Sequence, residues 1–128
     1  MFSLILCAFC VIVLTCVLIS CGSMDNYEEN LGRRYTVQYL DQDYIEFYTK
    51  LYDFPFDVYD VECGMKADHK NSEKFVVIFE CQSKSSARKL AKDLTYDIEN
   101  TEYKDLDIKR DGKFVFLGDK TSVTVALG

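Results

Sequence analysis

The sequence has little of what nucleic-acid binding requires. Its 15 Lys and Arg residues are outnumbered by 21 Asp and Glu residues, which gives a net charge of −6. The strongest basic groupings are the pairs Arg33-Arg34 and Lys109-Arg110, which we interpret as solvated surface. Because phosphate backbones are bound by clustered Lys and Arg, we expect no nucleic-acid partner.

Catalytic and metal-binding patterns are equally scarce. The only histidine, His69, falls in a polar turn predicted between two strands, and nucleophilic catalysis needs a nucleophile held by a base. The chain has no Cys-x-x-Cys pair after its first predicted strand, no zinc-type spacing and no glycine-rich phosphate loop. We therefore expect no catalytic residue, metal or cofactor. An enzyme that uses Asp and Glu side chains in a cleft is the alternative.

Three acids could offer oxygen ligands to calcium: Asp41, Asp43 and Glu46. They lie at the start of a predicted helix, where the helix dipole already favours negative side chains. The dipole is the simpler explanation, so these residues do not change the expectation that the chain holds no metal.

The amino-terminal segment is uncharged through residue 21, and residues 4–19 are almost continuously apolar. This run ends in Leu-Ile-Ser-Cys at residues 18–21, followed by Gly22-Ser23. The ending resembles the lipobox of bacterial lipoproteins, in which cleavage precedes a cysteine that carries diacylglycerol. The resemblance implies that Cys21 carries a lipid with acyl chains such as palmitate. Two acyl chains hold a protein stably on a bilayer, so it also implies an anchor on the extracytoplasmic face of the cell membrane.

The beginning of the leader departs from that pattern, because lipoprotein leaders normally start with Lys or Arg and Met1-Phe2-Ser3 contains neither. Two alternatives stay open. A cleaved secretory peptide would give a secreted soluble protein, and an uncleaved leader would be a single-span anchor, since spanning needs about 20 apolar residues. We divide the chain into a leader at 1–21, a flexible tether at 22–33 and a single α+β domain at 34–128.

The domain shows alternating strand and helix patterns. We predict strands at 35–40, 57–67 and 73–82, a helix that starts after Asp41 and stops at Pro55, and a second helix capped by Ser83. The pair Asp111-Gly112 predicts a type I′ turn between strands at 106–110 and 113–117. Residues 122–127 fit an edge strand or a short closing helix.

The resulting order, β-α-β-β-α-β with a terminal hairpin arm, predicts a ferredoxin-like fold. In that fold an antiparallel sheet carries both helices on one face. The predicted interior is formed by apolar and aromatic side chains from every element: Val37, Ile45, Tyr48, Leu51, Val61, Val77, Phe79, Leu90, Leu94, Ile108 and Phe116. This fold hosts many activities, so it does not select one.

Three carboxy-terminal segments form a recognisable series: the strand Phe75 to Phe79, the helix start Ser83-Lys84-Ser85-Ser86-Ala87, and the hairpin Arg110-Asp111-Gly112-Lys113-Phe114-Val115-Phe116-Leu117-Gly118. Together they resemble small uncharacterised lipoproteins of Firmicutes-type bacteria. The resemblance covers about the last 55 residues and the leader. It implies an anchored protein and no particular activity.

Two further pairs of residues are candidates for a role outside the cytoplasm. Cys63 and Cys81 lie on the two strands of a predicted hairpin, and an oxidising compartment would permit a disulfide; two buried thiols are the alternative. Tyr59 and Phe56 belong to an aromatic-rich stretch that could form a partner surface or simply core. We expect a membrane-tethered, non-catalytic binding or accessory module, whose partner is a protein or a small ligand.

Overall fold

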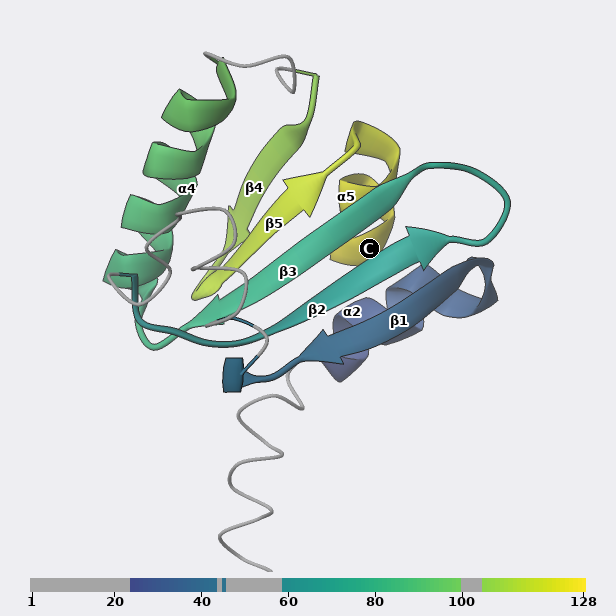
Figure 1. Ribbon diagram of the computed structural model, residues 1–128, viewed down its shortest axis with the longest axis horizontal. Coiled ribbons are helices and arrows are strands. Elements are labelled where there is room, and N and C mark those ends of the chain that lie inside the picture. The colour runs from purple at the N-terminus through teal and green to yellow at the C-terminus, as the bar shows by residue number, and fades with distance from the viewer. Residues whose placement is uncertain (1–23, 44, 46–58, 100–104) are drawn as a thin grey trace, which may run out of the picture.

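The computed structural model describes residues 24–43, 45, 59–99 and 105–128. Its centre is a five-stranded antiparallel sheet with the strand order β1-β2-β3-β5-β4 (Figure 1). The strands are β1 (Tyr35–Leu40), β2 (Val61–His69), β3 (Phe75–Cys81), β4 (Asp107–Asp111) and β5 (Phe114–Gly118). The prediction of an α+β protein with an antiparallel sheet is confirmed.

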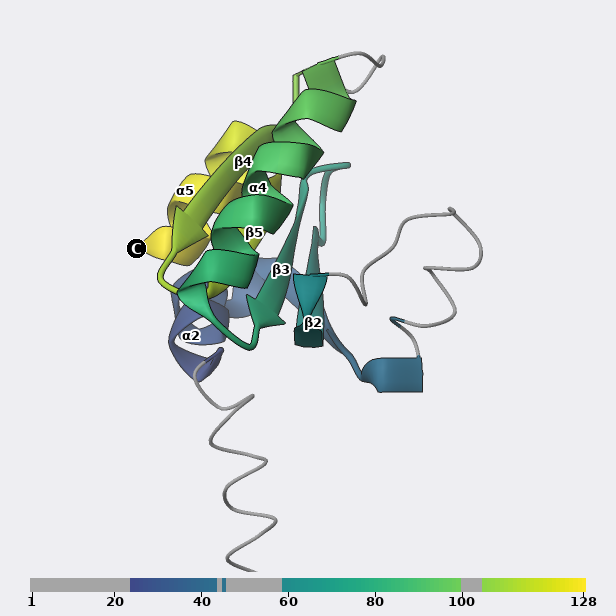
Figure 2. The same cartoon turned by 90° about the vertical axis from the view of Figure 1, so that its left-hand side faces the viewer.

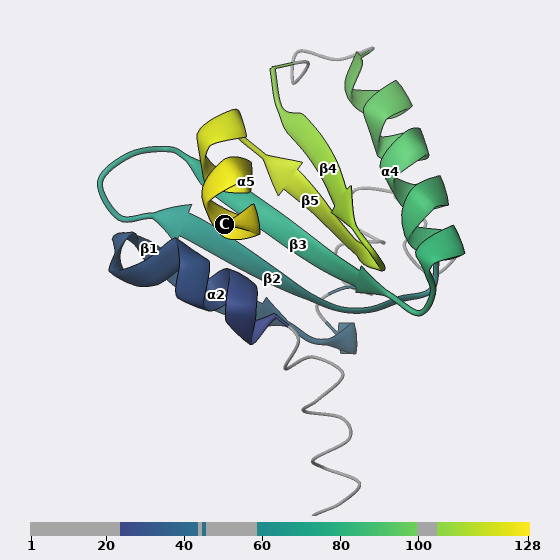
Figure 3. The same ribbon diagram turned by 180° about the vertical axis from the view of Figure 1, so that it is seen from behind.

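Helices cover both faces of the sheet. Helix α4 (Lys84–Glu99) packs on one face, and α2 (Asp25–Leu31) and α5 (Lys120–Leu127) pack on the other (Figures 2 and 3). Strand β3 serves both faces, because Val76 and Ile78 join the core under α2 and α5, whereas Phe79 joins the core under α4. The strand is apolar on both sides, as a central strand between two layers must be.

The ferredoxin-like arrangement is not confirmed, because β1 and β2 are hydrogen-bonded neighbours that run antiparallel. A ferredoxin-like fold joins its first two strands by a helical crossover, which makes them parallel and separates them in the sheet. One such helical crossover is present, from β3 through α4 to β4. Strands β3 and β4 both run antiparallel to β5, which lies between them, so they are parallel to each other. The predicted placement of two helices on one face stays a prediction, because most of the helix expected before Pro55 lies outside the described residues. The helices α2 and α5, which cover the face opposite α4, are not that predicted pair.

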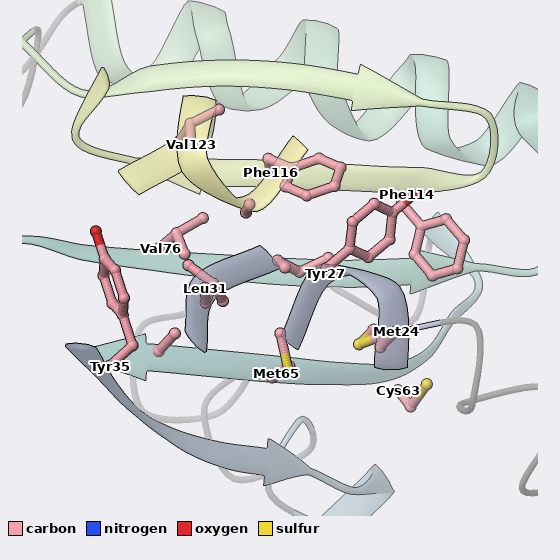
Figure 4. Close-up of a cluster of buried hydrophobic side chains, with 13 residues drawn as sticks. Met24, Tyr27, Leu31, Tyr35, Cys63, Met65, Val76, Phe114, Phe116 and Val123 are labelled. Atoms are coloured by element: carbon pink, nitrogen blue, oxygen red, sulfur yellow. The ribbon is translucent and has the colours of Figure 1, made fainter. Parts of the chain in front are cut away.

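The predicted tether at 22–33 is wrong over its described part. Residues 25–31 form α2, followed by the short 3-10 helix η1 (Gly32–Arg34). Met24, Tyr27 and Leu31 are 0, 9 and 3 % exposed and belong to the core between α2, α5 and the sheet (Figure 4). Their spacing of three and four residues is an apolar helical stripe, hidden in the sequence by the five polar or acidic residues between them.

Most of the remaining local predictions are confirmed. Ser83 caps α4, since its Oγ accepts a hydrogen bond from the Ser86 amide at 3.1 Å. The closing segment is the helix α5, capped by Asp119, whose side chain accepts from the Ser122 amide. Six predicted interior residues are buried and three are partly buried, while Tyr48 and Leu51 lie outside the described residues: Ile45, Val61, Phe79, Leu90, Leu94 and Phe116 are buried, and Val37, Val77 and Ile108 are partly buried.

The terminal hairpin forms, but its turn differs from the predicted type. Asp111 pairs with Phe114, so the two central turn residues are Gly112 and Lys113. Only Gly112 of the two has positive φ, at 59°, as at the first position of a type II′ turn. A type I′ turn would require positive φ at both central residues.

The predicted leader at 1–21 lies outside the described residues. So does most of the helix predicted before Pro55, of which residues 42, 43 and 45 are described and helical. Within the described ranges, we find no helix of the length and apolar character needed to cross a bilayer.

Candidate functional site

A pocket of about 440 Å³ lies at the end of the sheet where β1 begins and β2 ends. It is lined by parts of η1, the β2–β3 turn and α5. Three of its lining residues are basic, namely Arg33, Arg34 and Lys74, and His69 lines it as well. No Asp or Glu is among the described residues that line this pocket. We call it the basic pocket.

Local backbone geometry brings the two arginines to the basic pocket. Helix α2 ends at Gly32, which has φ 67° and ψ −156°, and its amide donates to the carbonyl of Glu28. Side chains strongly disfavour this region of φ and ψ, so glycine is required where the chain turns from α2 into η1. The carbonyl of Arg34 then accepts a hydrogen bond from the Lys70 amide at 2.8 Å, which ties η1 to the β2–β3 turn.

His69 and Tyr35 also line the basic pocket. Their rings meet edge to face with centroids 5.1 Å apart, and the Tyr35 hydroxyl lies 2.8 Å from Ser122 Oγ on α5. The Asn71 amide donates to His69 Nδ1 at 3.2 Å, so Nε2 carries the proton when the imidazole is neutral. His69 is the last residue of β2. Its ring packs against Tyr35, so the side chain is partly buried and not fully exposed as in a turn.

One carboxylate lies close to the basic pocket. Asp119 accepts hydrogen bonds from the amides of Phe75, at 2.8 Å, and Ser122, at 2.9 Å. Burial raises the pKa of Asp119, but these hydrogen bonds and the positive charge of Lys74 outweigh it, so the pKa lies below its usual value. Asp119 is thus occupied by backbone donors and offsets only part of the positive charge around the pocket.

The opposite end of the sheet holds a buried acid, Glu80, whose side chain is 0 % exposed. Cys63 Sγ donates to its Oε1 at 3.3 Å, and Lys113 Nζ lies 3.0 Å from its Oε2. Apart from this ion pair, Oε2 accepts no hydrogen bond from the described residues. Contact with Glu80 is the main reason that the pKa of Lys113 lies above its usual value. We interpret the cluster as structural, since Lys113 neutralises the acid.

The two candidate disulfide cysteines do not meet. Cys63 pairs with Glu80, and Val61 pairs with Cys81, because a β-bulge at Glu62 interrupts the register. The bulge sends Cys63 into the core under α2 and leaves Cys81 in the core under α4. Both are buried thiols, and burial is the main cause that raises the pKa of Cys81 to about 12. The sheet itself lies between them.

Tyr59 does not form part of an exposed partner surface, as one interpretation of the sequence had suggested. This residue is 7 % exposed and packs in the core under α4, where its hydroxyl donates to Asp93 at 2.7 Å. Burial first, and then the hydrogen bond to Asp93, raises the pKa of Tyr59 to about 12. Phe56 lies outside the described residues, as does Cys21.

The candidate calcium ligands are only partly described. Asp41 and Asp43 are exposed, and Glu46 lies outside the described residues. In the part of the chain that the structure describes, no three His, Cys, Asp or Glu side chains are grouped so that they could hold a metal ion.

The sequence reasoning missed the basic pocket because its parts are dispersed. Arg33 and Arg34 are exposed, as the sequence predicts, and His69 ends β2, but the sequence does not indicate that all three line one pocket. The available signal was the clustering of basic residues around two chain reversals: the arginine pair directly after Gly32, and Lys70 and Lys74 after His69. Nothing local shows that these reversals lie side by side.

Comparison with known proteins gives no relative from which to transfer a role. No protein-family model, curated protein or solved structure matches this chain significantly. The function must therefore be argued from the residues themselves.

Proposed function

We propose that the chain is an extracytoplasmic lipoprotein, anchored to the cell membrane through a lipid on Cys21, whose domain acts by binding rather than by catalysis. One observation carries the proposal. The lipobox-like ending at 18–21 is followed almost directly by Met24, which is the first described residue and is fully buried in the core. Cleavage before Cys21 would thus remove the apolar leader and leave the whole of α2 in place.

The close spacing has a mechanical consequence. Three Cα–Cα steps separate Cys21 from Met24, and each spans about 3.8 Å, so the lipidated residue would lie within about 11 Å of the core. A domain held by so short a link would lie at the membrane surface. Because Met24 and Tyr35 lie at opposite ends of the buried cluster (Figure 4), the basic pocket beside Tyr35 would face away from the anchor.

Intact mass spectrometry of the chain made with its leader in a bacterium tests the anchoring. We expect a mass that corresponds to cleavage before Cys21 with diacylglycerol added, and loss of that mass in Cys21→Ala. Cys16→Ala is the matched control, since it removes another leader cysteine outside the lipobox and should keep the lipid. A cleaved chain without lipid would show a secreted protein, and an uncleaved chain a single-span anchor; either result would overturn the proposal.

A further inference from the structure

The basic pocket concentrates positive charge on a protein that is otherwise acidic. The chain has a net charge of −6, yet three exposed basic residues, Arg33, Arg34 and Lys74, line one pocket whose described lining contains no acid. They come from two segments about 40 positions apart, joined by the hydrogen bond between the Lys70 amide and the Arg34 carbonyl. The fold itself therefore builds this concentration of charge.

The available donors suit an anion with several oxygens. Each guanidinium offers five N–H donors in a planar fork, and Lys74 adds an ammonium group. Three basic side chains and no Asp or Glu are among the described lining residues, and a phosphate monoester offers these donors more charge and more acceptor oxygens than a single carboxylate does. His69 and Thr121 line the same space and provide further polar contacts.

We propose that the basic pocket binds the phosphate group of a small soluble ligand. Its volume of about 440 Å³ falls in the range of small-molecule sites. The choice of a soluble source over a lipid headgroup rests on the anchoring through Cys21 proposed above, because that anchor places the pocket at the end of the domain away from its membrane. Phosphate recognition itself does not depend on the anchor.

The single histidine makes the pocket directly observable. His69 lines it and is the only histidine of the chain, so its imidazole C–H resonances report on this site alone. We would titrate the full chain in non-ionic detergent with inorganic phosphate at constant pH, and with sodium chloride at matched ionic strength. The expected result is a saturable shift with phosphate and none with chloride. A shift that follows only ionic strength would overturn the proposal.

Variants locate the binding. Charged hydrogen bonds contribute enough that Arg34→Gln and Lys74→Gln should each weaken phosphate binding about tenfold or more. Arg88→Gln is the matched control, because Arg88 is an exposed cation on α4, outside the basic pocket. Equal weakening by Arg88→Gln would show non-specific attraction and overturn the site. Circular dichroism of each variant establishes that it is folded.

A lipid arm distinguishes the source of the phosphate. The same resonances are recorded in phosphatidylcholine bicelles with and without phosphatidylglycerol. No shift is expected from the anionic lipid, whereas a shift equal to that of inorganic phosphate would overturn the soluble source. Because lipid attachment is read by mass and phosphate binding by His69, failure of the anchor and failure of the pocket give separate results.

Discussion

Leu31→Ala tests whether residues 24–31 are core or tether. Leu31 is 3 % exposed and packs between α5 and the sheet in the same cluster as Met24 and Tyr27. Truncating a buried leucine removes its transfer free energy and leaves a cavity, which together cost about 2 to 5 kcal/mol. That is a large share of the roughly 5 to 15 kcal/mol that stabilises a domain. A residue in a flexible tether would contribute nothing.

Urea unfolding, followed by far-ultraviolet circular dichroism, measures the effect. With a slope of about 1 to 3 kcal/mol per molar urea, the midpoint for Leu31→Ala should fall by about 1 to 3 M. Asn26→Ala is the matched control, because Asn26 lies on the exposed side of the same helix and surface substitutions change stability by about 0.5 kcal/mol or less. If the two variants unfold at the same urea concentration, α2 is not part of the core and our reasoning fails.

Three further predictions concern a close contact, a buried charge and a helix cap. In Gly118→Ala the added Cβ would clash with the backbone carbonyl oxygen of Phe75, so we expect a loss of several kcal/mol, near the upper end of single substitutions. In Gly112→Ala the added Cβ meets no atom within 4 Å and only the positive φ is unfavourable, so the loss should be about 1 to 3 kcal/mol. Thermal unfolding that ranks the two variants in reverse would contradict the expected clash. Lys113→Met leaves the buried carboxylate of Glu80 without its cation and should lower the free energy of unfolding by about 1 to 3 kcal/mol. In a double-mutant cycle, adding Glu80→Gln should recover part of this loss. Strictly additive effects would show that the two side chains are not coupled. The pKa of Asp119 is lower in the folded protein than its usual value of about 3.9, so its contribution to stability is complete above that value and is lost as pH falls through the folded pKa. In Asp119→Asn the free energy of unfolding should therefore decline less steeply below about pH 4. An unchanged slope would show that the Asp119 carboxylate does not stabilise the fold.

Elements whose signals are local could be predicted well. The cap of α4 needs only Ser83 and the Ser86 amide three residues later, and the apolar stripe of that helix repeats at helical spacing. The hairpin of β4 and β5 needs only a glycine between two β-favouring segments. In each case the interacting groups are close in sequence, so composition and spacing carry the information.

Features that depend on distant contacts required the tertiary structure. The polar sequence of α2 is helical because Met24, Tyr27 and Leu31 find an apolar sheet face and α5 to pack against, and an isolated helix of seven residues would not be stable. The bulge at Glu62 moves Cys63 to the face opposite Cys81 by one register shift, which strand alternation alone does not reveal.

By itself, the sequence determined an α+β domain with an antiparallel sheet, the positions of its described strands within a few residues, and an apolar amino-terminal segment that runs up to a cysteine. The tertiary structure decided the strand order, the helices on both faces and the basic pocket. Arg34 and Lys74 are 40 positions apart and approach each other only because β1 pairs with β2 and β2 pairs with β3. Such pairings are chosen by burial of the whole sheet, and no short segment of the chain records that choice.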